Sequence, residues 1–193
     1  MASATQGPPT SARVTSERRP ARSSAPLAAL LLFSSGLLLS QGFFHQSFYK
    51  TDAYGLIRGL LEDQPTWFNH FGCYQAFRWG FKILSRFGFP VYRACSLVVS
   101  LSYALSLVFV FLGFHRMSGR PRGALAATIL FAICPPVIFF STVVEHHAVF
   151  LAVASFAFYL FTIYRERPDW KWSFAVGLAT GLASYFHASG YVL

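Results

Sequence analysis

Charged side chains are scarce in this sequence. Asp, Glu, Lys and Arg together make up 12% of its 193 residues, whereas about 25% is usual for soluble globular domains. Hydrophobic residues account for 54% of the chain, and its mean hydropathy is +0.46. This composition argues against a water-soluble globule and favours a protein that is embedded in a membrane.

Cysteine is also scarce, which removes another class of fold. The sequence has three cysteines, and their spacing matches neither a disulfide framework nor a structural zinc motif. Cys95 and Cys134 fall inside hydrophobic runs, and Cys73 stands alone between two such runs. We expect these residues to act as small apolar fillers.

The sequence does contain hydrophobic runs that are long enough to cross a bilayer, which requires roughly 20 residues at about 1.5 Å each. Five runs approach this length: 25–43, 94–114, 124–140, 148–164 and 173–193. They predict an all-α, polytopic transmembrane helical bundle over residues 25–193. Residues 1–24 are rich in Ser, Thr, Pro and Arg, and we expect a disordered tail there. A cleaved signal peptide is the alternative for the first run, but no small-x-small cleavage site follows it.

The last run differs from the others in its polar and small residues. Gly177 and Gly181 have the spacing that permits close helix packing. His187 lies about 14 residues into this run, hence roughly 21 Å from its start. The run continues to Leu193 without a polar tail, so we expect the chain to be the N-terminal part of a longer protein.

The positive charge of the chain is grouped in a way that predicts membrane orientation. Ten of the sixteen Lys and Arg residues occupy three segments: Arg13, Arg18, Arg19 and Arg22; Arg116, Arg120 and Arg122; Arg165, Arg167 and Lys171. If the hydrophobic runs alternate in direction, these segments share one side, which the positive-inside rule makes cytoplasmic. The net charge of +9 thus reflects topology and contact with the lipid bilayer, and we expect no nucleic-acid partner. The N-terminus would be cytoplasmic, in a bacterial inner membrane or the endoplasmic reticulum.

The long segment 44–93 would then be external. Apolar residues at helical spacing predict a helix over 51–63. A second helix is predicted over 74–87, with basic and polar residues on one narrow face and aromatic or aliphatic residues around the rest of the helix. Such helices suit the membrane interface, so we expect interfacial amphipathic helices in this first external loop.

A few polar residues fall on the same external side. They are Asp52, Glu145, His146, His147 and His187. Ionisable groups beside the hydrocarbon region are energetically unfavourable and usually mark a substrate, ion or proton site. The sequence therefore predicts a polar site at the outer face.

Three segments of this outer face resemble the C-type glycosyltransferases, in particular the protein-mannosyltransferase and aminoarabinose-transferase-like branches. They are the acid-containing stretch 48–58 (FYKTDAYGLIR), the loop segment 67–70 (WFNH) and the turn 141–147 (STVVEHH). The resemblance covers about residues 25–193. It implies a membrane glycosyltransferase, of hexosyltransferase type, that takes a sugar from a polyprenyl-phosphate carrier.

The resemblance also implies roles for individual residues. Asp52 matches the acidic residue that serves as catalytic base or acceptor contact, although Ala53 stands where many members have a second acid. Arg58 would face the carrier phosphate or lipid headgroups. Glu145 and His146 are candidates for substrate contacts or for ligands of a divalent metal, while adjacent histidines alone are a weak metal pattern. No cofactor is firmly predicted.

Other interpretations of the same residues remain open. Asp52 could simply cap its helix. His70 could reach the site from the loop as a substrate contact or could be solvated, and His187 would be a neighbour of the site. The function alternatives are a transporter or lipid-handling protein and a non-catalytic membrane subunit. A transporter should carry further charges near the midplane, and the sequence shows none there.

Overall fold

The computed structural model describes residues 25–42, 51–64 and 70–187, and the regular elements in these ranges are all helical. In chain order they are α1 (Ala25–Gly42), α2 (Thr51–Leu61), α3 (Phe71–Leu84) with a 3-10 turn (Ser85–Phe87), α4 (Val91–Ser118), α5 (Pro121–Ala132), α6 (Pro135–Thr142), α7 (His146–Glu166) and α8 (Trp170–Phe186). The expected all-α membrane bundle is confirmed. Among the described helices, α1, α4 and α7 are each long and apolar enough to cross a membrane.

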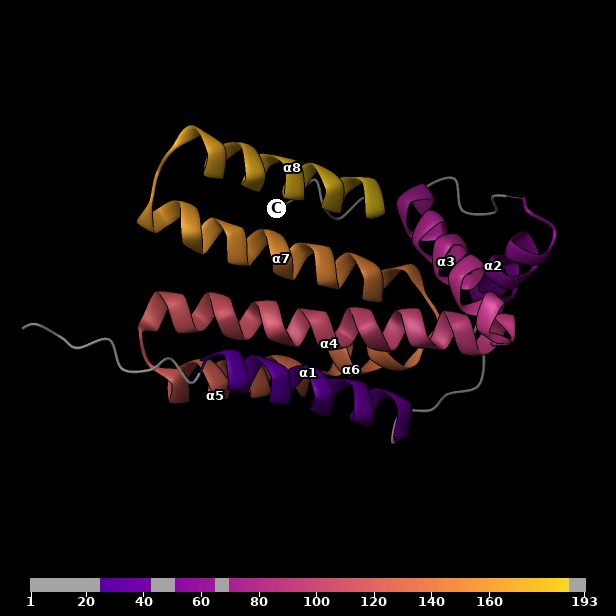
Figure 1. Ribbon diagram of the computed structural model, residues 1–193, viewed down its shortest axis with the longest axis horizontal. Coiled ribbons are helices and arrows are strands. Elements are labelled where there is room, and N and C mark those ends of the chain that lie inside the picture. Colours follow the sequence, from indigo (N-terminus) through magenta and orange to yellow (C-terminus); the bar gives the residue numbers. More distant parts are fainter. Residues whose placement is uncertain (1–24, 43–50, 65–69, 188–193) are drawn as a thin grey trace, which may run out of the picture.

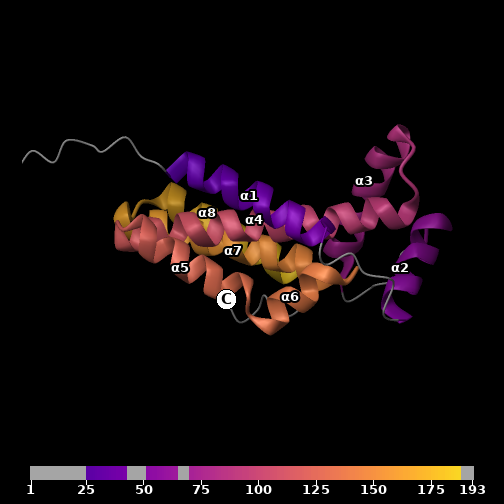
Figure 2. The same cartoon turned by 90° about the horizontal axis from the view of Figure 1, so that it is seen from below.

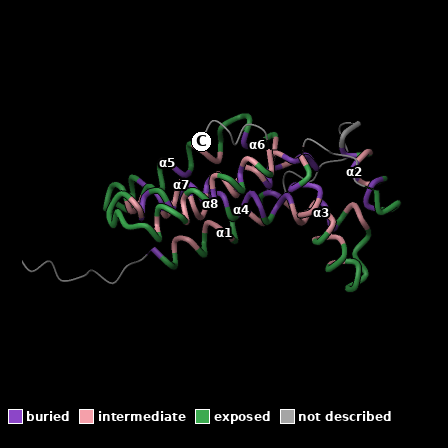
Figure 3. The backbone as a smooth tube through the Cα atoms, turned by 90° about the horizontal axis from the view of Figure 1, so that it is seen from above, coloured by how far each residue is buried: buried purple, intermediate pink, exposed green. Residues whose placement is uncertain are grey.

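Helix α4 forms the centre of the bundle. It packs against α1 on one side and α7 on the other, and α8 packs on the far side of α7 (Figure 1). In the most apolar window of α4, 56% of the residues are buried, compared with 17% in that of α1. Figure 3 shows the same contrast, with buried residues concentrated along the middle of the bundle. The outer surfaces of the other helices are apolar and exposed, as expected for contact with lipid.

The limits of α4 follow from its flanking residues. Pro90 precedes the helix in an extended conformation, and Gly119 follows it with φ of 64°. This left-handed conformation suits glycine and closes the helix, because the Gly119 N–H donates to the His115 carbonyl. The basic turn after α4 is therefore fixed locally by its glycine.

The run predicted over 124–140 is a bent pair of helices. Helices α5 and α6 meet at an angle of 65°. The break falls at Cys134, and Pro135 and Pro136 open α6, a position where the missing proline N–H does no harm. The pair is thus one broken span or a re-entrant segment.

The bundle has two chemically different ends. The chain reverses between successive long helices, so that α1 and α8 finish at the same end at which α4 and α7 begin (Figure 1). Helices α2 and α3 project beyond the bundle at this end, which we call the α3 end (Figure 2). The opposite end, called the basic end, carries the α4–α5 and α7–α8 turns with these residues: Arg116, Arg120, Arg122, Arg165, Arg167 and Lys171.

Close helix packing uses glycines other than the pair flagged in the sequence. A Cβ on Gly36 of α1 would lie 3.2 Å from the Ala104 Cα of α4, and one on Gly113 would lie 2.4 Å from the Phe158 ring of α7. A Cβ on Gly177 or Gly181 would meet nothing within 4 Å. The spacing of the α8 glycines permits close helix packing, and in the described part of the chain no other element uses it.

Candidate functional site

Four histidines meet at the α3 end, and we call them the histidine cluster: His70, His146, His147 and His187. His70 immediately precedes α3, His146 and His147 open α7, and His187 directly follows α8. Residues far apart in the sequence thus converge because three helices begin or finish at this end. The polar residues predicted to share the outer face share one end of the bundle.

Three rings of the cluster are nearly parallel. The His70 and His146 centroids lie 3.8 Å apart with an interplanar angle of 8°, and the His70 and His187 centroids lie 4.6 Å apart at 8°. The His146 and His187 centroids are 4.9 Å apart. One nitrogen of each of these three histidines lies within 4.8 Å of the others. The arrangement brings three imidazole nitrogens to one small region.

His147 connects this group to a buried carboxylate. Its ring centroid lies 4.1 Å from that of His146 and 4.0 Å from that of Phe140, which stacks on it. Its Nδ1 lies 3.1 Å from Oε2 of Glu145, whose residue is only 2% exposed. A carboxylate accepts hydrogen bonds, so Nδ1 of His147 is the donor in this contact.

Cys73 fixes the position of α3 over the cluster. Its buried thiol donates to the backbone carbonyl of His146 at 3.2 Å and to that of Phe186 at 3.1 Å. Burial raises the pKa of Cys73 to about 12, so the sulfur keeps the proton that it donates. The thiol therefore ties α3 to the backbone beside both His146 and His187. From the sequence, Cys73 was expected to be a small apolar filler, which misses this role. Its position three residues after His70 is the feature of the sequence that could have indicated a place beside the site.

Gly72 lets α3 approach the end of α8. A Cβ at this position would lie 2.5 Å from the Tyr185 ring and 3.0 Å from the Tyr185 carbonyl oxygen. Real side chains do not tolerate the first of these distances, so the approach of α3 depends on glycine. His70, two residues earlier, is brought to the cluster by the same contact.

The surroundings favour the uncharged form of the His187 ring. Burial, together with the neighbouring His147 and His70, lowers the pKa of His187 to about 4. His187 lies beyond the end of α8 and outside the spanning helices. Neutral imidazoles can accept a proton, bind a hydroxyl group or ligate a metal ion.

The structure brings together four of the residues singled out in the sequence: Glu145, His146, His187 and His70. His70 is half-buried, and its ring packs against those of His146 and His187. Arg58 is placed differently. Its side chain is 77% exposed, and its Nε donates to Glu62 on the same side of α2 at 2.8 Å. Asp52 belongs to the first turn of α2, but its side chain lies outside the described residues.

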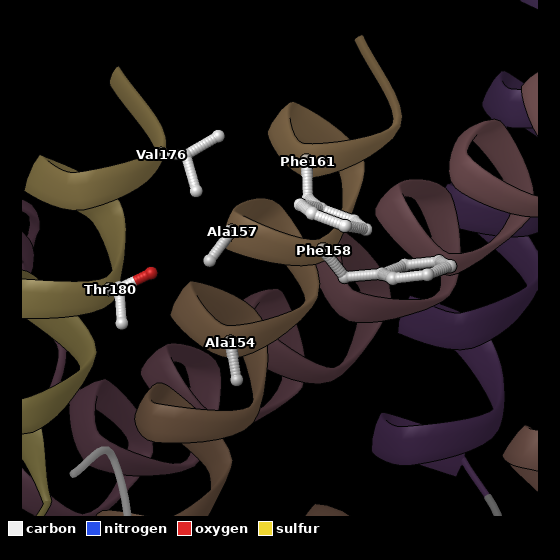
Figure 4. Close-up of a pocket in the computed structure, with 6 residues that line it drawn as sticks. All are labelled: Ala154, Ala157, Phe158, Phe161, Val176 and Thr180. Atoms are coloured by element: carbon white, nitrogen blue, oxygen red, sulfur yellow. The ribbon is translucent and has the colours of Figure 1, made fainter. Parts of the chain in front are cut away.

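A cavity of about 240 Å³ lies between α7 and α8, away from the histidines. We call it the α7–α8 cavity. Figure 4 shows its lining side chains: Ala154, Ala157, Phe158, Phe161, Val176 and Thr180. The lining is almost entirely apolar, so this cavity suits a hydrocarbon chain and offers no group for acid–base chemistry.

Comparison with known proteins gave one family. A family model described as dolichyl-phosphate-mannose-protein mannosyltransferase matches residues 77–193, which is more than half of the chain. The matched segment contains Glu145, His146, His147 and His187, and it begins after α2 and His70. Comparison with curated proteins and with solved structures gave no match.

Proposed function

The chain belongs to the dolichyl-phosphate-mannose-protein mannosyltransferase family, which consists of membrane glycosyltransferases of the C type, and from this premise we propose that it moves a sugar from a polyprenyl-phosphate carrier to an acceptor hydroxyl. Transfer takes place at the α3 end, on the non-cytoplasmic side of the membrane. The observation that carries the proposal is that the family match includes three of the four clustered histidines and the buried Glu145.

Asp52 is the proposed catalytic base. Glycosyl transfer to a hydroxyl group needs a proton acceptor within hydrogen-bond reach of the attacking oxygen. The next residue, Ala53, is fully buried in an apolar cluster that also contains Val144 and Ala148, which flank the Glu145–His147 segment. The first turn of α2 and the start of α7 are therefore parts of one packed unit, which supports a shared site for Asp52 and Glu145.

Glu145 and His146 are the proposed substrate contacts, with His70 and His187 beside them. A neutral imidazole and a buried carboxylate can both hold sugar hydroxyl groups, because each offers a hydrogen-bond acceptor in a partly dehydrated setting. Four rings also present flat apolar faces, against which the C–H face of a sugar packs. This explains why ring faces and polar edges gather at the same place.

The carrier phosphate needs positive charge nearby as it departs. Arg58 is the proposed contact, because its side chain is exposed at the α3 end and is paired, among the described residues, with the exposed Glu62. An exposed ion pair of this kind contributes about 1 kcal/mol or less, so Arg58 can exchange its partner for a phosphate at small cost. Arg78 of α3, paired with Asp63 at 2.7 Å, is a second cation on the same side.

The isoprenoid chain of the carrier is proposed to lie in the α7–α8 cavity. Helices α7 and α8 line this cavity (Figure 4). At the α3 end of the bundle, α7 begins with His146 and α8 is followed by His187. A chain bound between the two helices would run along the bundle toward the cluster. The headgroup would then meet the polar site while the hydrocarbon stays among apolar side chains.

A transporter is less well supported. In α1, α4 and α7, every Asp, Glu, Lys and Arg lies within three residues of a helix terminus. A proton or ion relay would require ionisable groups farther along the spans. The described polar groups of the site lie instead at one end, which suits chemistry at a surface.

The test is sugar transfer from a labelled polyprenyl-phosphate donor by the full chain in membranes, compared with Asp52→Asn. Loss of the general base should lower the transfer rate by roughly 10²–10⁴-fold. Glu166→Gln is the matched control, because it removes an exposed carboxylate at the basic end of the bundle, and it should transfer at nearly the original rate. Undiminished transfer by Asp52→Asn would exclude Asp52 as the base.

A further inference from the structure

We infer that His70, His146 and His187 form a binding site for a divalent transition-metal ion of the zinc class. The inference goes beyond the proposed function, because a carboxylate base and a carrier phosphate require no such ion. From the sequence, Glu145 and His146 were the candidate metal ligands. The structure instead points to three histidines from three different segments.

The first argument is the convergence of donors. One nitrogen of each histidine lies within 4.8 Å of the other two. Zinc binds histidine nitrogen at about 2.0–2.1 Å, which places tetrahedral ligand nitrogens about 3.4 Å apart. Each nitrogen therefore has to move by about 1 Å, which small side-chain rotations provide. The ring planes, now parallel within 8° to 14°, would turn their edges toward the ion.

The second argument is the chemical type of the donors. Imidazole nitrogen suits zinc, copper, nickel and iron, whereas calcium and magnesium prefer oxygen. Cys73 lies next to the cluster, but its thiol is directed at two backbone carbonyls. The ligand set is thus three nitrogens without sulfur, the composition found in catalytic zinc sites that keep a fourth position for water or substrate.

The third argument is the buried carboxylate. Glu145 is 2% exposed, and its Oε2 is bound by Nδ1 of His147, whose ring packs against His146 and His187. A carboxylate in this position supplies countercharge for a divalent ion. Carboxylate–histidine pairs commonly surround zinc sites and orient the ligands.

The ion would have a defined structural effect. His70 belongs to the segment that opens α3, while His146 and His187 belong to α7 and α8. Binding all three would fasten the external helices to the bundle, in addition to the thiol contacts of Cys73. Metal binding should therefore raise the thermal stability of the full chain, by an amount that grows with the logarithm of the free-metal concentration above the Kd.

The experiment uses the purified full chain in detergent, stripped with a chelator and then titrated with Zn²⁺ or Co²⁺. The expected result is one ion per chain and, with Co²⁺, the intense visible absorption of a tetrahedral site. His70→Ala, His146→Ala and His187→Ala should each lose binding by more than the roughly 10–100-fold that follows removal of a ligand-orienting partner. His147→Ala should keep the stoichiometry and lose affinity within that range. Helix content from circular dichroism identifies any variant that does not fold.

The matched control is His115→Ala. His115 lies at the other end of α4, where its ring stacks on Phe111 at 5.7 Å, and this variant should bind the ion as the unmodified chain does. Absence of stoichiometric binding by the unmodified chain would overturn the inference, as would unchanged binding by the three folded ligand variants. Because no sugar donor is present, failure here leaves the proposed transfer reaction intact, and failure of transfer leaves the metal site intact.

Discussion

The two ends of the bundle handle polar groups in opposite ways. At the basic end, Arg116 pairs with Glu166 at 2.5 Å, and their side chains are 30% and 44% exposed. At the α3 end, the carboxylate of Glu145 is buried and bound to an imidazole. Exposed ion pairs contribute little to stability and do not need defined geometry. Buried polar groups require specific partners. The arrangement at the α3 end is therefore the specific one, and it is the one that indicates a functional site.

Among the substitutions that test this difference between the two ends, Gly72→Ala is expected to change the thermal midpoint most. The new Cβ would collide with the ring and carbonyl of Tyr185, and such overpacking destabilises by about 1–3 kcal/mol. We expect a lower thermal midpoint in detergent and weaker docking of α3. Gly177→Ala, where a Cβ meets nothing within 4 Å, is the control and should be neutral or slightly stabilising. Equal midpoints for the two variants would contradict the close approach of α3 to α8.

A smaller effect is expected from Cys73→Ala. The substitution removes a thiol that donates to two carbonyls, and a typical hydrogen bond contributes about 0.5–1.5 kcal/mol to stability. Cys73→Ser keeps a donor and should recover part of the thermal midpoint. Because the pKa of Cys73 is raised to about 12, its labelling by iodoacetamide in the folded chain should stay slow between pH 7 and pH 9. Labelling of Cys73 that is fast at pH 8 and levels off near pH 9, as for an ordinary thiol with a pKa of about 8.5, would show that α3 is not held in this way.

Much of this contrast could be predicted from the sequence. The hydrophobic runs imply a helical bundle, and alternation of their direction assigns Glu145, His146 and His187 to the end opposite the basic turns. The sequence left open whether His70 reaches the site or is solvated, because its convergence with the other histidines depends on the close approach at Gly72 and on the thiol contacts of Cys73. The 65° bend between α5 and α6 also required the structure, since the prolines indicate a break without its angle. The spacing of Gly177 and Gly181 was misleading, because it permits close packing but does not require it.

The central claim is that sugar transfer depends on the buried polar groups of the α3 end, and the most direct test compares one carboxylate from each end. Transfer from a labelled polyprenyl-phosphate donor is measured for Glu145→Gln and for Glu166→Gln in the same membranes at equal protein level. Glu145→Gln should lower the rate by roughly 10–100-fold, as removal of a carboxylate that orients a histidine usually does. Glu166→Gln should stay within about fivefold of the unmodified chain, because an exposed pair contributes about 1 kcal/mol or less. Equal rates for the two variants, or a larger loss for Glu166→Gln, would contradict the assignment of the α3 end as the site of transfer.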